Sequence, residues 1–133
     1  MTLKRVVVTG MGAVTPIGND IATFWKNAVD GLSGAGKITH FDASKYKTQF
    51  ACEVKNFDPK LYLDRSEIKR TDLYSQYGLH TAAQAIEDAG FDINKMDPFD
   101  VGVIWATGQG GLGTIENEVQ HYTENEKNPR FSP

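Results

Sequence analysis

The chain has 133 residues, a length typical of one domain; 40% of the residues are hydrophobic and 23% are charged, which argues against wholesale disorder. Its 14 basic and 17 acidic residues give a net charge of −3, which disfavours non-specific nucleic-acid binding, because such binding needs a basic surface. No apolar run approaches the roughly 18 residues of a membrane span and the N-terminus lacks signal-peptide features, so we expect a cytoplasmic protein with no membrane partner.

Strand and helix patterns alternate along the first part of the chain. Residues 5–9, Arg-Val-Val-Val-Thr, predict a strand buried on both faces, and the glycines and proline of residues 10–18 predict a tight loop after it. Asn19 or Asp20 is expected to cap a helix, which Gly31 should end. The apolar stripe of that helix consists of Ile21, Phe24, Trp25, Ala28 and Val29.

The middle of the chain predicts a loop and a second strand. Residues 32–48 are rich in glycine and polar side chains and predict a loop. Residues 50–57 alternate between apolar and charged positions, which predicts a half-exposed strand with Phe50, Cys52 and Val54 on its apolar face. Cys52 is therefore expected to be a small buried hydrophobe rather than a nucleophile.

A longer helix and another strand–loop–helix unit follow. The helix is expected to begin at Thr71 or Asp72 and to end at Ala89, before Gly90. Residues 101–107 predict a second buried strand, residues 108–113 a second glycine loop, and Thr114 can cap a last helix. The order strand, helix, strand, helix, strand, helix is typical of an α/β fold with a largely parallel sheet.

The first glycine loop superficially resembles a dinucleotide-binding loop. Thr15 stands where the third glycine of that fingerprint belongs, and Pro16 delays the helix, so its N-terminus is not placed for a pyrophosphate. No Gly-Lys-Ser/Thr sequence is present. A tight turn is the favoured interpretation, and a nucleotide-binding α/β module is the disfavoured alternative.

The second glycine loop offers a better candidate site. Four glycines among residues 108–113 indicate positive φ angles or the close approach of another group. Ligands bind at the carboxyl ends of strands in open α/β sheets, where this loop is expected to lie. A sharp turn or close subunit packing explains the glycines equally well.

The histidines show no metal-ligand spacing. His40, His80 and His121 lie about 40 residues apart, so no metal and no cofactor is expected, and a single cysteine excludes an internal disulfide. We expect His80 to pack its helix against a neighbour and His121 to be solvated. No complete catalytic constellation is visible.

A basic cluster precedes the long helix. Arg65, Lys69 and Arg70 span about one and a half helical turns, and Lys69 follows Arg65 by four residues, so these two can share a face. The cluster is either a solvated helix entrance or a docking site for an acidic partner.

Several segments together resemble the N-terminal part of the β-ketoacyl-acyl carrier protein synthases, specifically the synthase II type of bacterial fatty-acid synthesis. Each segment alone is weak, but their order and spacing are specific. The matching segments are Arg-Val-Val-Val-Thr-Gly-Met-Gly-Ala-Val-Thr-Pro-Ile-Gly (5–18), Phe-Trp-Lys (24–26), Gly-Leu-Ser-Gly (31–34), His-Phe-Asp (40–42), Gln-Tyr-Gly (76–78) and Gly-Gly-Leu-Gly-Thr-Ile-Glu (110–116). The terminal Phe-Ser-Pro also looks like the segment that leads into the central strands of the family.

The resemblance implies a thiolase-like layered α-β-α-β-α fold and a homodimer that performs a decarboxylative Claisen condensation. A cysteine would hold the acyl chain, and two histidines would assist decarboxylation of malonyl-acyl carrier protein. None of the chain's own cysteine and histidines matches these positions. We therefore expect residues 1–133 to be an incomplete N-terminal segment of the synthase, inactive alone. A non-catalytic partner of the chain-length-factor type, which lacks the cysteine, is the alternative.

The resemblance also assigns candidate sites. Gly108, Gln109, Gly110 and Gly111 look like the family's wall of the acyl pocket next to the dimer interface, although a polar Gln109 departs from the usual apolar gate. Arg65, Lys69 and Arg70 match the basic patch that receives the acyl carrier protein, which favours docking over a solvated helix entrance. Ser66 stands where a further lysine is common.

Overall fold

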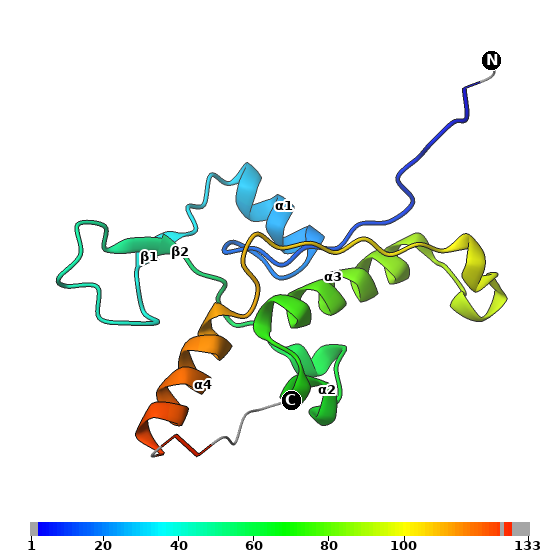
Figure 1. Ribbon diagram of the computed structural model, residues 1–133. Helices are drawn as coiled ribbons and strands as arrows, with labels where there is room; N and C mark the ends of the chain where they lie inside the picture. The colour runs from blue at the N-terminus through cyan, green and yellow to red at the C-terminus, as the bar shows by residue number, and fades with distance from the viewer. Residues whose placement is uncertain (1–2, 126, 129–133) are drawn as a thin grey trace. The chain divides into compact units, whose positions relative to one another are not determined.

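The computed structural model describes residues 3–125, 127 and 128 (Figure 1). The chain divides into two compact units, one formed by residues up to 58 with 81–91, the other by 59–80 with the residues from 92 onward. The described elements are α1 (Ile21–Val29), β1 (Ala35–Lys37), β2 (Phe50–Cys52), α2 (Arg65–Arg70), α3 (Leu73–Ala89), α4 (Leu112–Glu124) and 3₁₀ helices at Pro59–Leu61, Ile93–Lys95 and Pro98–Asp100.

In the first unit, the first glycine loop packs against the second half of α3. A Cβ atom on Gly10 would run into the backbone of that helix. The backbone N–H of Met11 donates to the Asp88 carboxylate at 2.9 Å, and the N–H of Ala13 donates to Gln84 Oε1 at 2.9 Å. The glycine is therefore explained by close helix packing, and these two loop N–H groups are already hydrogen-bonded.

The first helix forms as predicted. The Asp20 carboxylate caps α1 by accepting a hydrogen bond from the backbone N–H of Thr23 at 2.7 Å. Gly31 adopts φ 70° just beyond the end of the helix. Gly90 likewise adopts φ 65° after α3, which confirms the predicted end of that helix.

A short antiparallel hairpin replaces the predicted loop and longer strand. In β1 and β2, Ala35 lies opposite Cys52 and Lys37 lies opposite Phe50. The first strand was missed because its central glycine is a poor strand former. The burial prediction for the second strand was wrong, because Phe50 and Cys52 are both exposed.

In the second unit, side chains lock α2 to the start of α3. The amide Nε2 of Gln76 donates to the carbonyls of Ile68 at 3.1 Å and Thr71 at 2.9 Å. The His80 ring is only 2% exposed and meets the Tyr62 ring edge-on, with centroids 4.7 Å apart. The predicted packing role of His80 is thereby confirmed.

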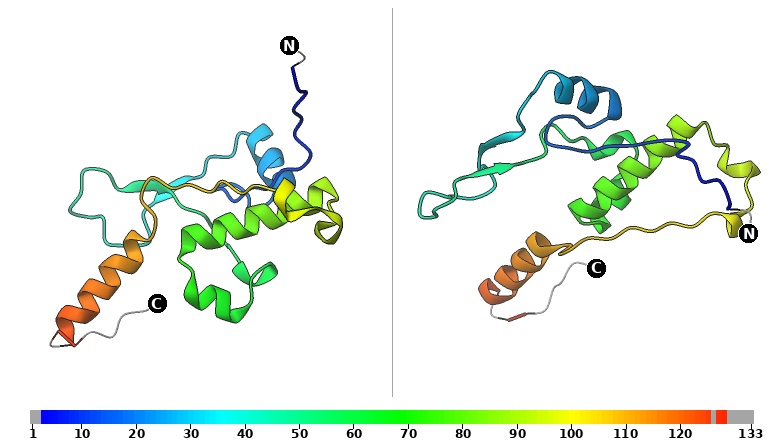
Figure 2. Two further views of the ribbon diagram at one scale, coloured as in Figure 1. Left: turned by 45° about the vertical axis from the view of Figure 1, so that its right-hand side comes forward. Right: turned by 90° about the horizontal axis from the view of Figure 1, so that it is seen from above.

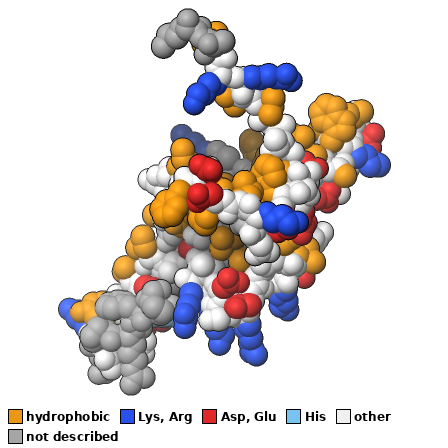
Figure 3. All heavy atoms as spheres, turned by 90° about the vertical axis from the view of Figure 1, so that its right-hand side faces the viewer, with side chains coloured by type: hydrophobic (Ala, Val, Ile, Leu, Met, Phe, Trp, Pro, Cys, Tyr) orange, Lys and Arg blue, Asp and Glu red, His pale blue; other side chains and the backbone are white. Residues whose placement is uncertain are grey.

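The two predicted buried strands are not strands in the described chain. Residues 5–9 and 101–107 run as coil in all three views of Figures 1 and 2. Val6 is 91% exposed and Ile104 is 97% exposed, and hydrophobic side chains are visible on the face in Figure 3. A buried strand needs neighbours on its edges and cover on both faces; the described residues supply no neighbouring strand, and their cover is partial, as where the Trp105 ring lies against Gly78 of α3. The described residues therefore form no parallel sheet, and that part of the prediction is wrong for them.

The second glycine loop leads directly into α4. Gly111, in the left-handed region with φ 72°, is the N-cap residue of this helix. The prediction that Thr114 caps the helix was wrong, because the helix begins two residues earlier and Thr114 lies in its first turn. No helix among the described residues is long and apolar enough to cross a membrane.

Candidate functional site

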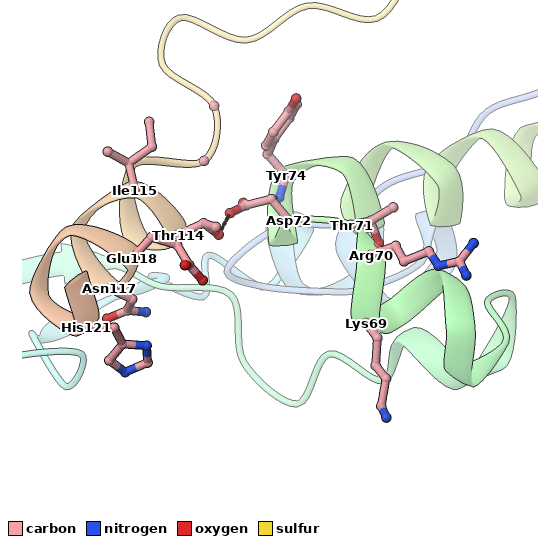
Figure 4. Close-up of a pocket in the computed structure, with 12 residues that line it drawn as sticks. Lys69, Arg70, Thr71, Asp72, Tyr74, Thr114, Ile115, Asn117, Glu118 and His121 are labelled. Carbon is pink, nitrogen blue, oxygen red and sulfur yellow. Dashed lines mark hydrogen bonds between the residues drawn. The ribbon is translucent and has the colours of Figure 1, made fainter. Parts of the chain in front are cut away.

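A hollow of about 520 Å³ lies in the second unit (Figure 4). Its walls come from the end of α2, the start of α3, the second glycine loop and one side of α4 as far as His121. The residues that line it are Lys69, Arg70, Thr71, Asp72, Tyr74, Gly110, Gly111, Thr114, Ile115, Asn117, Glu118 and His121.

The hollow brings together parts of both sites predicted from the sequence. Lys69 and Arg70 of the basic cluster line it, and so do Gly110 and Gly111 of the second glycine loop. The other predicted site residues, Gly108, Gln109 and Arg65, are exposed and do not belong to its lining.

A carboxylate at the junction of α2 and α3 joins the two sides of the hollow. The backbone carbonyl of Asp72 accepts a hydrogen bond from the backbone N–H of Gln76 at 3.0 Å. Oδ1 of its carboxylate accepts from the backbone N–H of Tyr74 at 3.3 Å. Oδ2 of the same carboxylate accepts a hydrogen bond from the Thr114 hydroxyl of α4, the dashed line in Figure 4. One side chain therefore contacts the first turns of two helices.

The glycine loop presses against the start of α3. A Cβ atom on Gly110 would lie 2.7 Å from Cε1 of Tyr74 and 2.8 Å from Cγ2 of Thr107. Gly108 has open space around the same position. The glycine-rich composition is therefore required by close packing at Gly110 and by φ at Gly111, but not at Gly108.

The basic side chains of the hollow face solvent. Lys69 and Arg70 are exposed in the last turn of α2, and in Figure 4 the Arg70 side chain extends away from α4. His121 is exposed on α4, as predicted. Exposed cations in one helical turn are suited to steering an acidic macromolecule rather than to burying a small anion.

Sequence reasoning missed the pairing of Asp72 with Thr114. Asp72 was named only as a possible start of the long helix and Thr114 only as a candidate cap, and no local pattern relates two positions 42 residues apart. The contribution of Tyr74 to the loop was missed for the same reason.

The described residues offer little support for metal or nucleotide chemistry. Within them, no group of three or more His, Cys, Asp or Glu side chains could hold a metal ion. At the first glycine loop, the N–H groups of Met11 and Ala13 that a phosphate would need already donate to side chains of α3.

Comparison with known proteins places the chain in a family. Residues 3–133 match the family described as beta-ketoacyl synthase, N-terminal domain. The 3-oxoacyl-[acyl-carrier-protein] synthase 2 of Staphylococcus aureus (strain COL) is 42% identical over 96% of this chain and 30% of its own length. The enzyme of the same name from Coxiella burnetii is 45% identical over 87% of this chain and 28% of its own length. The chain thus spans about a third of the length of these curated relatives.

Solved structures show the same fold class. The ishigamide ketosynthase/chain length factor superposes with a TM-score of 0.74 and 26% identity, over 90% of this chain and 30% of that chain. A type II polyketide synthase ketosynthase, solved with its acyl-carrier protein and bound to the hexaketide, gives a TM-score of 0.70 and 25% identity, over 89% and 31%. The α/β, thiolase-like fold class expected from the sequence is confirmed, and the chain belongs to the beta-ketoacyl synthase family, with residues 3–133 matching the N-terminal domain of that family.

Proposed function

We propose that residues 1–133 are the N-terminal segment of a 3-oxoacyl-acyl carrier protein synthase of fatty-acid biosynthesis. The observation that carries the proposal is the 42–45% identity to synthases of this name over most of the chain. The segment supplies a basic docking helix and one wall of an acyl pocket, and the reacting side chains belong to the remainder of the synthase.

The proposed reaction extends an acyl chain by two carbons. A cysteine thiolate of the complete protein attacks the acyl thioester of the carrier protein, forms an acyl-enzyme thioester and releases the carrier thiol. Malonyl-acyl carrier protein then loses CO₂, and the resulting carbanion attacks the acyl-enzyme carbonyl. The new C–C bond yields 3-oxoacyl-acyl carrier protein and returns the cysteine thiolate, while two histidines stabilise the developing negative charge.

The proposed partners are acyl-acyl carrier protein, malonyl-acyl carrier protein and a second copy of the complete synthase. The exposed Lys69 and Arg70 at the end of α2, with Arg65 one turn earlier, suit an acidic carrier surface. A solved relative is a ketosynthase in complex with its acyl-carrier protein, which favours the same class of partner. We place the reaction in the cytoplasm, and the site requires no metal or cofactor.

A second candidate is a non-catalytic partner of the chain-length-factor type. It is favoured by the likeness to the ishigamide ketosynthase/chain length factor. The two candidates differ at the nucleophile position of the complete protein, where a synthase has cysteine.

The test uses the complete protein that carries this chain. It is incubated with acyl-acyl carrier protein and malonyl-acyl carrier protein, and the 3-oxoacyl product is measured by mass spectrometry. Product that requires the cysteine at the nucleophile position supports the synthase. A protein that lacks this cysteine and forms no product, but restores condensation by a separate ketosynthase, supports the chain-length factor instead.

A further inference from the structure

We propose that Asp72 is a positioning residue that fixes the position of the second glycine loop relative to the basic helix α2. The inference rests on the proposed function, because it links the proposed carrier-docking residues to the proposed acyl-pocket wall. It assigns a role to a side chain that no sequence motif singled out.

The first observation is the lack of a side-chain cap on α4. Gly111 is its N-cap residue and provides no side-chain hydrogen bond, and the first turn contains no acidic residue. Helix N-termini favour a nearby negative charge, because their first N–H groups lack partners and the helix dipole is positive there. An acidic group from elsewhere in the chain is therefore stabilising at this position.

Asp72 provides that group. Its Oδ2 accepts from the Thr114 hydroxyl in the first turn of α4, and it would lie 3.7 Å from a Cβ atom built on Gly111. A carboxylate at this end of α4 also disfavours a bound anion, so the hollow is better described as a junction of elements than as a phosphate site.

The second observation is that Asp72 is itself held firmly. Its carbonyl accepts the N–H of Gln76, whose side-chain amide in turn binds the carbonyls of Ile68 and Thr71 at the end of α2. Gln76 is only 8% exposed. A continuous series of hydrogen bonds therefore runs from α2 to the first turn of α4.

The third observation is a packing contact beside the hydrogen bond. Tyr74, two residues after Asp72, lies against Gly110 so closely that the glycine has no space for a side chain. The loop is thus fixed to the start of α3 at two adjacent points. The consequence is that the distance between the docking helix α2 and the proposed pocket wall is fixed, so a carrier docked on α2 presents its acyl chain to the wall in one position.

The first test measures amide hydrogen exchange in the complete protein. Asp72→Ala and Thr114→Val should each accelerate exchange of the amides of residues 115–118, the first that donate hydrogen bonds within α4, by about tenfold. The double variant should exchange no faster than Asp72→Ala alone, because both changes remove the same interaction.

Thr114→Ser keeps the hydroxyl and should retain protection. Thr123→Val removes a hydroxyl that donates to the Val119 carbonyl near the other end of α4 and should leave the exchange of the 115–118 amides unchanged. Unchanged exchange in Thr114→Val, or multiplicative effects in the double variant, would overturn the link.

The second test separates the proposed positioning role of Asp72 from a general contribution to the stability of the fold. Asp72→Ala and Thr114→Val should lower kcat/KM for the carrier-borne acyl donor several-fold more than for the same acyl group on a small thiol, which does not dock on α2. Equal losses of kcat/KM with both donors would contradict the positioning role. If the wild-type protein condenses neither donor, the proposed function fails, while the exchange experiment still decides whether Asp72 and Thr114 act together.

Discussion

Individual glycines of the second loop carry different structural requirements, although the sequence presents them as one run. Gly111 has φ 72° and Gly110 has no room for a Cβ atom, whereas Gly108 and Gly113 have open space. Composition alone predicted that some residue of the loop needs glycine. It could not say which one, because φ and close contacts depend on how the loop meets α3.

A substitution series in the complete protein tests this distinction. Gly111→Ala should lower the free energy of unfolding by about 1–2 kcal/mol, because an L-residue is strained in the left-handed region. Gly113→Ala should raise it by up to about 1 kcal/mol, because the residue lies within α4. Gly108→Ala is the matched control and should be near neutral. Chemical denaturation measures all three, and a loss at Gly108 as large as that at Gly111 would contradict the assignment.

Glu53 gives the hairpin a pH dependence. Its carboxylate accepts from the Thr39 N–H at 2.9 Å and from the Thr39 hydroxyl at 2.7 Å, and these bonds lower the pKa of Glu53 below its ordinary value. A lowered pKa means that the folded hairpin favours the carboxylate. The stabilisation is therefore present above the ordinary pKa and is lost as the pH falls through the lowered one.

NMR titration of ¹³C-labelled glutamate carboxyl groups in the complete protein measures the effect. The Glu53 resonance should titrate below the bulk of the exposed glutamates, and Thr39→Val should move its pKa upward. Glu53→Gln identifies the resonance. A Glu53 pKa at or above that of the other glutamates would show that the bonds to Thr39 do not hold in solution.

At the scale of elements, local signals predicted α1 and the end of α3 correctly, but they misplaced the start of α4 and predicted the strands poorly. Asp20 and Gly31 mark the ends of α1, and Gly90 marks the end of α3, because caps and stops act within a few residues. The strand at β1 was missed and β2 was predicted too long, since strand formation depends on a distant partner. Of the residues that line the hollow, the sequence analysis named Lys69, Arg70, Gly110 and Gly111 as site residues, but it named Asp72 only as a possible start of the long helix.

Charge reversal in α2 tests the docking helix as an element. Lys69→Glu with Arg70→Glu should weaken binding of the acyl carrier protein by about tenfold or more, because exposed complementary charges steer association. Hydrolysis of a small acyl thioester by the complete protein should change much less. The hydrogen bonds that hold the end of α2 use backbone carbonyls of Ile68 and Thr71, so they survive these side-chain changes.

Lys45→Glu with Lys47→Glu is the matched control for the docking experiment. Both lysines are exposed in the loop between β1 and β2, and the pair changes the net charge by the same amount. Surface plasmon resonance at two salt concentrations compares the variants, because charge steering weakens as salt rises. A similar loss in both pairs would indicate a general effect of net charge and would count against a docking role for α2.

At the scale of the molecule, the fold class was predictable but the sheet was not. Motif order identified the family, while the valine-rich segments at residues 5–9 and 101–107 predicted buried strands that the described chain leaves exposed. The chain spans about a third of its curated relatives. We therefore expect these segments to become strands in the complete protein, where other parts of the sequence can pair with them and cover their faces.

The substitution Ile104→Lys should affect stability differently in the isolated chain and in the complete protein. Ile104 is 97% exposed here, so Ile104→Lys should leave the isolated chain unchanged in dye binding and thermal melting, and that melt should be broad because the apolar segments lack cover. In the complete protein the same change would place a charge in a buried strand and should cost about 3 kcal/mol or more. Gln120→Lys, an exposed position on α4, is the control with the same charge change. A complete protein that tolerates Ile104→Lys as readily as Gln120→Lys, or an isolated chain that melts cooperatively, would show that residues 101–107 need no further part of the synthase.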